Sequence, residues 1–263
     1  MNTRSARRLS LTAVAWILAL ALPAQDPAPA KGPDKEIADK LATLKDVVAD
    51  KKFARDAEGV SIIDDLLKKA QAGVDPKDAT AIVKGLDGVL STGKVRPPDN
   101  TSLYNGAIAA LGRLGPEGAK ALKAAYSGKR FPDKKEWVPL REQLLKNIGR
   151  TKDESMVKFL VDEARRSPEA ALQAAAGEAL GNYEESKEAI RKEIVGDLIV
   201  TWGELSEVAS QMGSNNVAAQ NAQDRLSALS DKWNTSFAKL TRQNFSSFRE
   251  WQTWYNKNKS VAW

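Results

Sequence analysis

The 263-residue sequence contains no cysteine and no histidine. The absence of cysteine excludes disulfides, thiolate nucleophiles and zinc sites with sulfur ligands. The absence of histidine removes the usual general base, the histidine-activated nucleophile and the imidazole metal ligand. Because only carboxylate, lysine, tyrosine or hard-metal chemistry remains, we expect a protein with no enzymatic activity, no cofactor and no metal site.

Long apolar runs are also scarce, and the clearest one spans residues 9–22. Three arginines precede this run, and Pro23-Ala24 follows it. A basic start, a short apolar segment and small residues at its end are typical of a secretory signal peptide. The run is shorter than the ~20 residues that a membrane-spanning helix needs.

We therefore predict a signal peptide over residues 1–24, cleaved after Ala24, with Ala21 and Ala30 as alternative cleavage positions. A proline-rich linker over residues 25–34 would follow it. Cleavage would leave a secreted or periplasmic protein without an integral membrane segment. In the alternative interpretation, the apolar segment is retained as an amino-terminal anchor.

A strong excess of one charge sign is absent once the predicted signal peptide is removed. The whole chain has 40 Lys and Arg against 34 Asp and Glu, a formal net charge of +6. Loss of Arg4, Arg7 and Arg8 lowers this charge to +3. The remaining basic residues are interleaved with acidic ones, as at residues 50–52, whereas a nucleic-acid-binding surface concentrates Lys and Arg. We therefore expect no nucleic-acid partner.

After residue 34, apolar residues recur at every third or fourth position, which is the spacing of one face of a helix. The first such stripe consists of Ile37, Leu41, Leu44 and Val47. Two breaks between stripes, Asp75-Pro76 and Ser167-Pro168, combine a capping side chain with a proline suited to the first helical turn. The pattern predicts an all-α protein.

A repeat is visible in the middle of the chain. Three stretches begin with Leu and end, nine residues later, with a glycine that follows Leu or Ile: Leu103 to Gly112, Leu140 to Gly149 and Leu172 to Gly181. These glycines suit the left-handed residue that closes a helix. A second amphipathic stretch follows each one, at residues 119–126, 156–164 and 189–199. Two helices in each unit of this length predict stacked helix pairs.

These alanine- and leucine-rich helices end in Leu111-Gly112, Ile148-Gly149 and Leu180-Gly181, and in them the sequence resembles HEAT and armadillo-type repeat proteins. The resemblance implies an α–α superhelix, a HEAT-like solenoid, over residues 35–212, followed by a helical cap over residues 213–263. The chain also looks like secreted HEAT-repeat proteins of planctomycete-type bacteria, a likeness that implies no activity. A non-repeating helical bundle is the alternative fold.

Aromatic residues make up only 6% of the chain, yet almost half of them lie after residue 232. Phe245, Phe248, Trp251 and Trp254 are spaced by three residues and would form an oblique stripe along a helix. In one interpretation, this stripe is core that closes the end of the stack. In the other, some rings face solvent and bind sugars, a peptide or lipid headgroups. The candidate binding surface then consists of Trp251, Trp254, Tyr255 and Trp263.

The repeat and the missing catalytic residues together predict an exported, non-enzymatic scaffold that binds another protein. The alternative is a polysaccharide- or cell-envelope-binding module that uses the four candidate aromatic residues. A third hypothesis is an enzyme with a HEAT-like fold, such as the alkylpurine-DNA glycosylases or the bilin lyases. Export and low net charge argue against the first of these enzyme classes, and no residue supports the second.

Overall fold

The structure, a computed structural model, describes residues 34–211 and 216–263, which are helical almost throughout. These residues form eleven α-helices and no β-strand, so the all-α prediction is confirmed. The predicted signal peptide, the predicted linker up to residue 33 and the predicted boundary at 212/213 lie outside the described residues. The helices are α1 (Lys35–Ala49), α2 (Asp56–Ala72), α3 (Pro76–Ser91), α4 (Ser102–Leu111), α5 (Gly115–Ser127), α6 (Val138–Arg150), α7 (Val157–Arg166), α8 (Ala170–Leu180), α9 (Glu188–Ser210), α10 (Val217–Thr241) and α11 (Phe248–Asn258).

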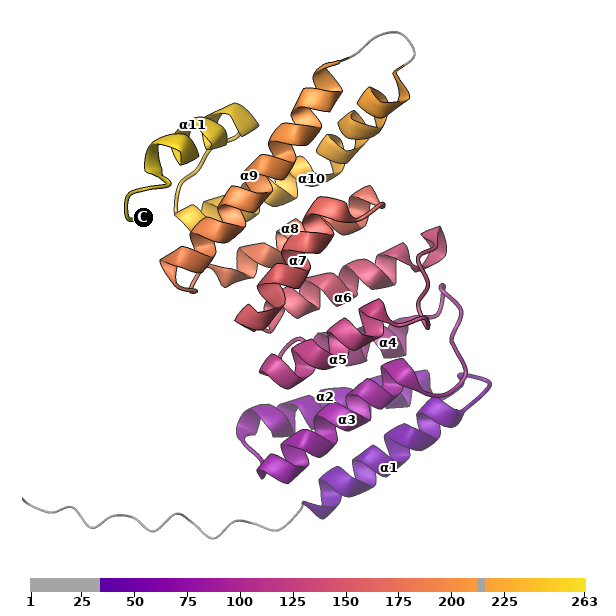
Figure 1. Cartoon of the computed structure of the whole chain (residues 1–263). Helices are drawn as coiled ribbons and strands as arrows, with labels where there is room; N and C mark the ends of the chain where they lie inside the picture. The colour runs from indigo at the N-terminus through magenta and orange to yellow at the C-terminus, as the bar shows by residue number, and fades with distance from the viewer. Residues whose placement is uncertain (1–33, 212–215) are drawn as a thin grey trace, which may run out of the picture. The chain divides into compact units, whose positions relative to one another are not determined.

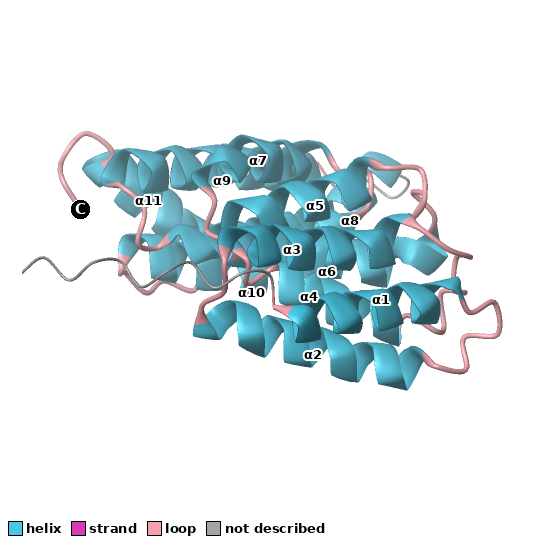
Figure 2. Cartoon of the chain, turned by 90° about the horizontal axis from the view of Figure 1, so that it is seen from below, coloured by secondary structure: helices cyan, strands magenta, loops and turns pink. Residues whose placement is uncertain are grey.

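The helices alternate between two rows (Figures 1 and 2). In the even row, α2, α4, α6, α8 and α10 each contact the next member. In the odd row, α1 contacts α3, α3 contacts α5, α7 contacts α9, and α9 contacts α11. Consecutive helices also pack across the rows, most extensively α7 with α8 and α9 with α10. Packing of helices in pairs is therefore confirmed. The pairs differ from the predicted repeat units, because α5 packs mainly with α6, α7 with α8 and α9 with α10, whereas the predicted units joined α4 with α5, α6 with α7 and α8 with α9.

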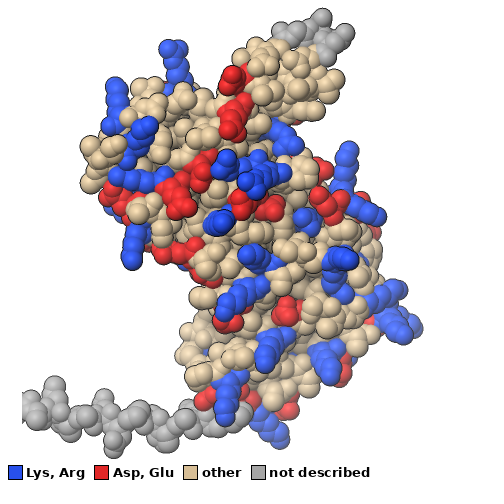
Figure 3. Space-filling view, viewed as in Figure 1, with Lys and Arg blue, Asp and Glu red and all other residues tan. Residues whose placement is uncertain are grey.

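Surface charge is mixed on the face that Figure 3 draws, where basic and acidic side chains are interspersed. Some of these charges join neighbouring helices. Lys40 of α1 lies 2.7 Å from Asp65 of α2, and Arg165 of α7 lies 3.3 Å from Asp197 of α9. Because exposed ion pairs contribute only ~0–1 kcal/mol each, the stack depends mainly on its buried contacts.

One of the two predicted helix starts is confirmed and the other is wrong. Asp75 caps α3 by accepting a hydrogen bond from the backbone N–H of Lys77 at 2.8 Å, and Pro76 is the first helical residue. Ser167 does not cap α8, which begins at Ala170. It follows the end of α7 in an extended conformation, as expected before a proline, and its carbonyl accepts a hydrogen bond from Arg225 at 2.9 Å.

The predicted left-handed conformation of the repeat glycines is also wrong. Gly112 and Gly181 have φ values of −60° and −62°, and Gly149 lies inside α6. In the turns after α4 and α6, the left-handed residue lies three positions after the repeat glycine, at Gly115 (φ 62°) and Lys152 (φ 55°). The chain therefore continues in right-handed turns past each glycine before it reverses.

The repeat glycines instead allow successive helices of the even row to approach closely. A Cβ added to Gly149 would lie 2.4 Å from the carbonyl oxygen of Ala179 in α8. A Cβ at Gly181 would lie 3.0 Å from the Cα of Ser236 in α10. At Gly112 it would lie 2.6 Å from Oδ1 of Asn147 in α6. The repeated glycine is thus a contact between neighbouring helices of one row.

Helix α8 is enclosed by its neighbours on almost every side. Four of its alanines are at most 1% exposed: Ala174, Ala175, Ala176 and Ala179. Their small side chains leave room for the adjoining helices, and the indole of Trp233 in α10 lies directly against Gly177. The Ser236 hydroxyl of α10 donates a hydrogen bond to the Gly177 carbonyl at 2.9 Å. The alanine-rich sequence of α8 is therefore explained by close packing.

Buried arginines connect segments that are distant in sequence. Arg96 is completely buried and forms a bidentate pair with Asp56, with N···O distances of 2.8 and 2.6 Å. Burial opposes the charge of Arg96, but the hydrogen bond and charge of Asp56 outweigh it, so the pKa of Arg96 is raised. Arg141 of α6 donates to the carbonyls of Tyr126 and Phe131 at 3.1 and 2.9 Å. Arg141 thus provides hydrogen-bond partners for one backbone carbonyl in the last turn of α5 and one in the segment that leads from α5 toward α6.

The carboxyl-terminal helices continue both rows. Helix α10 packs on α8 and pairs with α9, and α11 packs on α9. Apolar residues of α10 that are spaced by three or four positions are buried, including Leu229, Trp233, Phe237 and Leu240. Trp202 of α9 packs against Trp233 and Phe237 at ring distances of 6.1 and 6.0 Å. The predicted boundary at 212/213 thus falls between two helices that pack as a pair.

The glycine contacts predict that replacing two helical glycines by alanine changes the free energy of unfolding in opposite directions. We expect Gly149→Ala to lower the free energy of unfolding by ~2–3 kcal/mol, because the new methyl group would overlap the backbone of α8. We expect Gly88→Ala in α3 to raise it by ~0.5–1 kcal/mol, since no atom lies within 4 Å of its Cβ position and alanine favours helix. Urea denaturation measures both values. Equal effects at the two positions would contradict the proposed close approach.

Candidate binding surfaces

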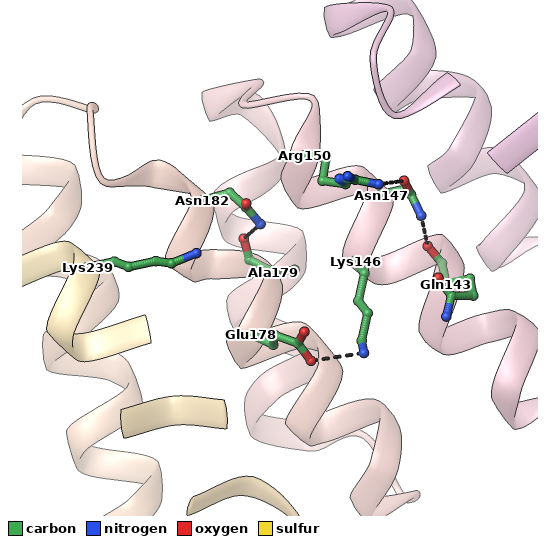
Figure 4. Close-up of a pocket in the computed structure, with 8 residues that line it drawn as sticks. All are labelled: Gln143, Lys146, Asn147, Arg150, Glu178, Ala179, Asn182 and Lys239. Atoms are coloured by element: carbon green, nitrogen blue, oxygen red, sulfur yellow. Dashed lines mark hydrogen bonds and ion pairs between the residues drawn. The ribbon is translucent and has the colours of Figure 1, made fainter. Parts of the chain in front are cut away.

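A polar pocket of about 230 Å³ opens on the even row, where α6, α8 and α10 meet (Figure 4). Helix α6 contributes four residues, α8 and the short 3₁₀ turn after it contribute three, and α10 contributes one. The lining residues are Gln143, Lys146, Asn147, Arg150, Glu178, Ala179, Asn182 and Lys239. The pocket therefore depends on three successive members of the even row.

Hydrogen bonds to the backbone orient the two asparagines of this pocket. Asn147 is buried, and its Nδ2 donates to the carbonyl of Gln143 at 2.8 Å. Its Oδ1 accepts a long hydrogen bond from Arg150 at 3.4 Å. Asn182 donates through Nδ2 to the carbonyl of Ala179 at 3.0 Å. The pocket wall is thus held by local contacts at the ends of α6 and α8.

Positive charge predominates in the pocket. Three of its lining side chains are cationic, and Glu178 is the single carboxylate. Lys146 lies 3.1 Å from Oε2 of Glu178, and Lys232 lies 4.0 Å from the same oxygen. Figure 4 shows Lys239 reaching toward Asn182 from α10, while Arg150 and Lys146 extend from α6. The arrangement can bind an anion by charge and hydrogen bonding.

The structure separates the four aromatic residues predicted as a binding surface. Trp251 is completely buried in the core, and its indole N–H donates to Oδ1 of Asn234 at 2.7 Å. Trp254, Tyr255 and Trp263 are half-buried. The Tyr255 hydroxyl group lies against Gly196 of α9, where an added Cβ would be 2.5 Å away. Trp254 and Trp263 contact each other edge to face at 5.0 Å.

Two basic residues of α9 hold the segment after α11. Arg191 donates to the backbone carbonyl of Trp263 at 2.9 Å, and Lys192 donates to that of Val261 at 2.7 Å. Both cations also lie 5.7 Å from the centre of the Trp263 ring. Glu188, which forms an ion pair with Lys192 at 2.7 Å, has a lowered pKa because of the hydrogen bond from that lysine. Trp263 thus packs against α9.

An open groove of about 400 Å³ runs beside Trp254. It is lined by Phe245, Arg249, Glu250, Thr253, Trp254 and Lys257. The predicted stripe is wrong at Phe245, which precedes α11 and contacts Trp251 edge to face at 4.8 Å. Glu250 closes the capping box of α11 with Ser247, and the hydrogen bond from the Ser247 hydroxyl group lowers the pKa of Glu250. The groove therefore combines aromatic surface with charged rims.

Sequence reasoning found Trp254 but missed the polar pocket. Lys146 and Lys239 are far apart in the sequence, and each resembles an ordinary solvated charge on a helix. The repeat pattern did align α6 with α8, since the repeated glycine lies within one residue of the last residue of each helix. To predict that α10 lies next to α8, the sequence would have had to indicate that α9 and α10 pack together on either side of the Gly- and Asn-containing segment between them.

No protein-family model and no curated protein matches the chain. Within the described residues, none of the helices combines the length and hydropathy of a membrane-spanning segment, and no group of three or more acidic side chains has the geometry to hold a metal ion. The polar pocket between α6, α8 and α10 and the groove beside Trp254 are the two candidate surfaces.

The different burial of the tryptophans predicts different effects on stability. We expect Trp251→Ala to lower the free energy of unfolding by ~3–5 kcal/mol, because it removes a buried ring and leaves a cavity. We expect Trp254→Ala to cost ~1 kcal/mol, since its ring borders an open groove. Denaturation followed by circular dichroism tests this difference. Comparable losses would mean that Trp254 is as much a core residue as Trp251.

Proposed function

We propose that this chain is an exported, non-enzymatic scaffold that binds another protein along a HEAT-like solenoid. The alternation of helices between two rows supports the solenoid, because each new pair adds one helix to each row. The repeated glycine supports it further. At Gly112, Gly149 and Gly181 the end of one even-row helix contacts the next helix of that row. Translationally repeated contacts of this kind are expected of stacked repeats.

The observation that carries the binding proposal is the pocket on the even row. It is formed by three successive helices and cannot exist in an isolated helix pair. Stacked helical repeats create extended surfaces from adjacent units in this way. The polar lining, which has charged and amide groups at the surface, favours recognition of a polar partner segment over burial of a large apolar ligand.

Export and the absence of catalysis are supported by the sequence. Residues 1–24 have the basic start, the apolar run and the small residues of a secretory signal peptide. A chain without histidine and cysteine lacks the side chains on which most acid–base and nucleophilic catalysis depends. A secreted or periplasmic binding protein needs neither residue type.

Site-specific photo-crosslinking in the organism that encodes the chain tests the scaffold proposal. A photoreactive amino acid replaces either Gln143, on the even-row pocket, or Lys158, an exposed residue of α7 in the odd row. We expect one discrete protein adduct in the exported fraction from position 143 and none from position 158. No adduct at either position, or the same adducts at both, would contradict a binding face on the even row.

The groove beside Trp254 favours a second candidate function, binding of a cell-envelope polysaccharide. Sugar rings stack on the faces of aromatic side chains, and polar groups at the edges bind their hydroxyl groups. Phe245 and Trp254 provide the aromatic surface, and Arg249, Thr253 and Lys257 provide polar groups. Of the four aromatic residues predicted as a binding surface, Trp254 is the one that lines this groove.

Tryptophan fluorescence during titration with envelope glycans tests this second function. We expect a saturable change in the wild-type chain that is lost in Trp254→Phe, because that ring lies at the groove. Lys239→Gln, on the other candidate surface, serves as the control and should respond as the wild type does. An unchanged spectrum across a panel of glycans would eliminate the polysaccharide-binding candidate.

A further inference from the structure

We infer that the pocket between α6, α8 and α10 binds a carboxylate side chain, Asp or Glu, from an extended acidic segment of the partner protein. This inference rests on the proposed scaffold function and specifies the chemistry of its partner. It concerns the polar pocket of Figure 4 and is independent of the aromatic groove beside Trp254.

The pocket has more positive charge than its own carboxylate can balance. Lys146, Arg150 and Lys239 line it together with Glu178, and Lys232 lies within 4.0 Å of that same carboxylate. The carboxylate is therefore shared between two lysines, whereas Arg150 has only a long hydrogen bond to the neutral amide of Asn147. A negatively charged ligand would complete the balance of charge.

The cations reach the pocket from different helices. Lys239 extends from α10 on one side of the pocket, and Arg150 extends from α6 on the other (Figure 4). A carboxylate has two oxygens, so it can accept from the planar guanidinium of Arg150 and from an ammonium group simultaneously. Gln143 is exposed at the rim, where its amide can bind the backbone of an extended segment.

Size and lining favour an amino-acid side chain over a sugar. The cavity measures about 230 Å³, and the residues that line it include no aromatic ring on which a pyranose could stack. The aromatic groove beside Trp254 provides such rings and is larger, at about 400 Å³. The two surfaces therefore suit different ligands, and the small polar pocket suits the carboxylate of a peptide.

The cations could instead have a purely structural role. Arg150 and Lys239 lie in the last turns of α6 and α10, where the helix dipole favours positive charge. That role predicts that their removal lowers the melting temperature and leaves the binding of acidic peptides unchanged. Ligand binding predicts the opposite pattern, so each variant needs both measurements.

Fluorescence anisotropy with the full chain and a labelled peptide of alternating glutamate and serine tests the inference. We expect binding that weakens with added salt and that is at least tenfold weaker for the matched glutamine–serine peptide. Lys239→Gln and Arg150→Gln should each weaken binding about tenfold. Lys158→Gln, which removes the same charge from the odd row, should change it by less than about twofold, because its effect is long-range and screened.

Three results of these titrations would overturn the inference. The first is equal binding of the glutamate and glutamine peptides, and the second is equal loss of affinity in the pocket variants and in Lys158→Gln. The third is binding of a carboxylated oligosaccharide, but not of the peptide, through Lys239 and Arg150. If crosslinking at position 143 captures a protein whose binding ignores these substitutions, the scaffold stands and the carboxylate site fails. If the peptide binds the pocket but no protein is captured, the carboxylate site stands and the scaffold fails.

Discussion

Close approach between successive helices of the even row is the constraint on which the rest of the structure depends. Helices with ordinary side chains at their contacts lie 8–10 Å apart, and smaller residues allow the shorter separations. Here Gly149 touches the backbone of α8, and Gly177 and Gly181 touch α10. Because α8 is enclosed by its neighbours and has almost no exposed side chain, a larger residue at these contacts would displace the helices on both sides.

The same contacts create the candidate site. Since α6 and α8 meet at Gly149 and Ala179, the last turns of both helices lie side by side, and Lys146 reaches Glu178. The contact of α8 with α10 then brings Lys239 to the pocket. No loop of variable conformation is needed to assemble these groups. A site built on packed helices is more rigid than one built on loops, which favours selective recognition.

The sequence predicted the helices well because their signals are local. Apolar spacing located the six helices of the three repeat units, and Asp75 capped α3 where expected. The conformation of the repeat glycines and the capping role of Ser167 were mispredicted. These residues make contacts with helices that are distant in the sequence, and such contacts leave no local signal. The same limit explains why the pocket was not predicted, because its cations on α6 and α10 come together only through α8. For the aromatic residues, the three-residue spacing could not distinguish Trp251, which is buried, from Trp254, which lines the groove.

The most direct measurement of the close approach is a disulfide crosslink across the even row, for which a cysteine-free chain is a suitable background. A Cβ at Gly181 would lie 3.1 Å from the Cβ of Ser236 in α10. A disulfide spans ~3.5–4.5 Å between its two Cβ atoms, so the bond requires α8 and α10 to move apart there by only a few tenths of an ångström. The account predicts that Gly181→Cys combined with Ser236→Cys forms this bond completely under mild oxidation in the folded protein. Two free thiols that a colourimetric reagent titrates under the same conditions would contradict it.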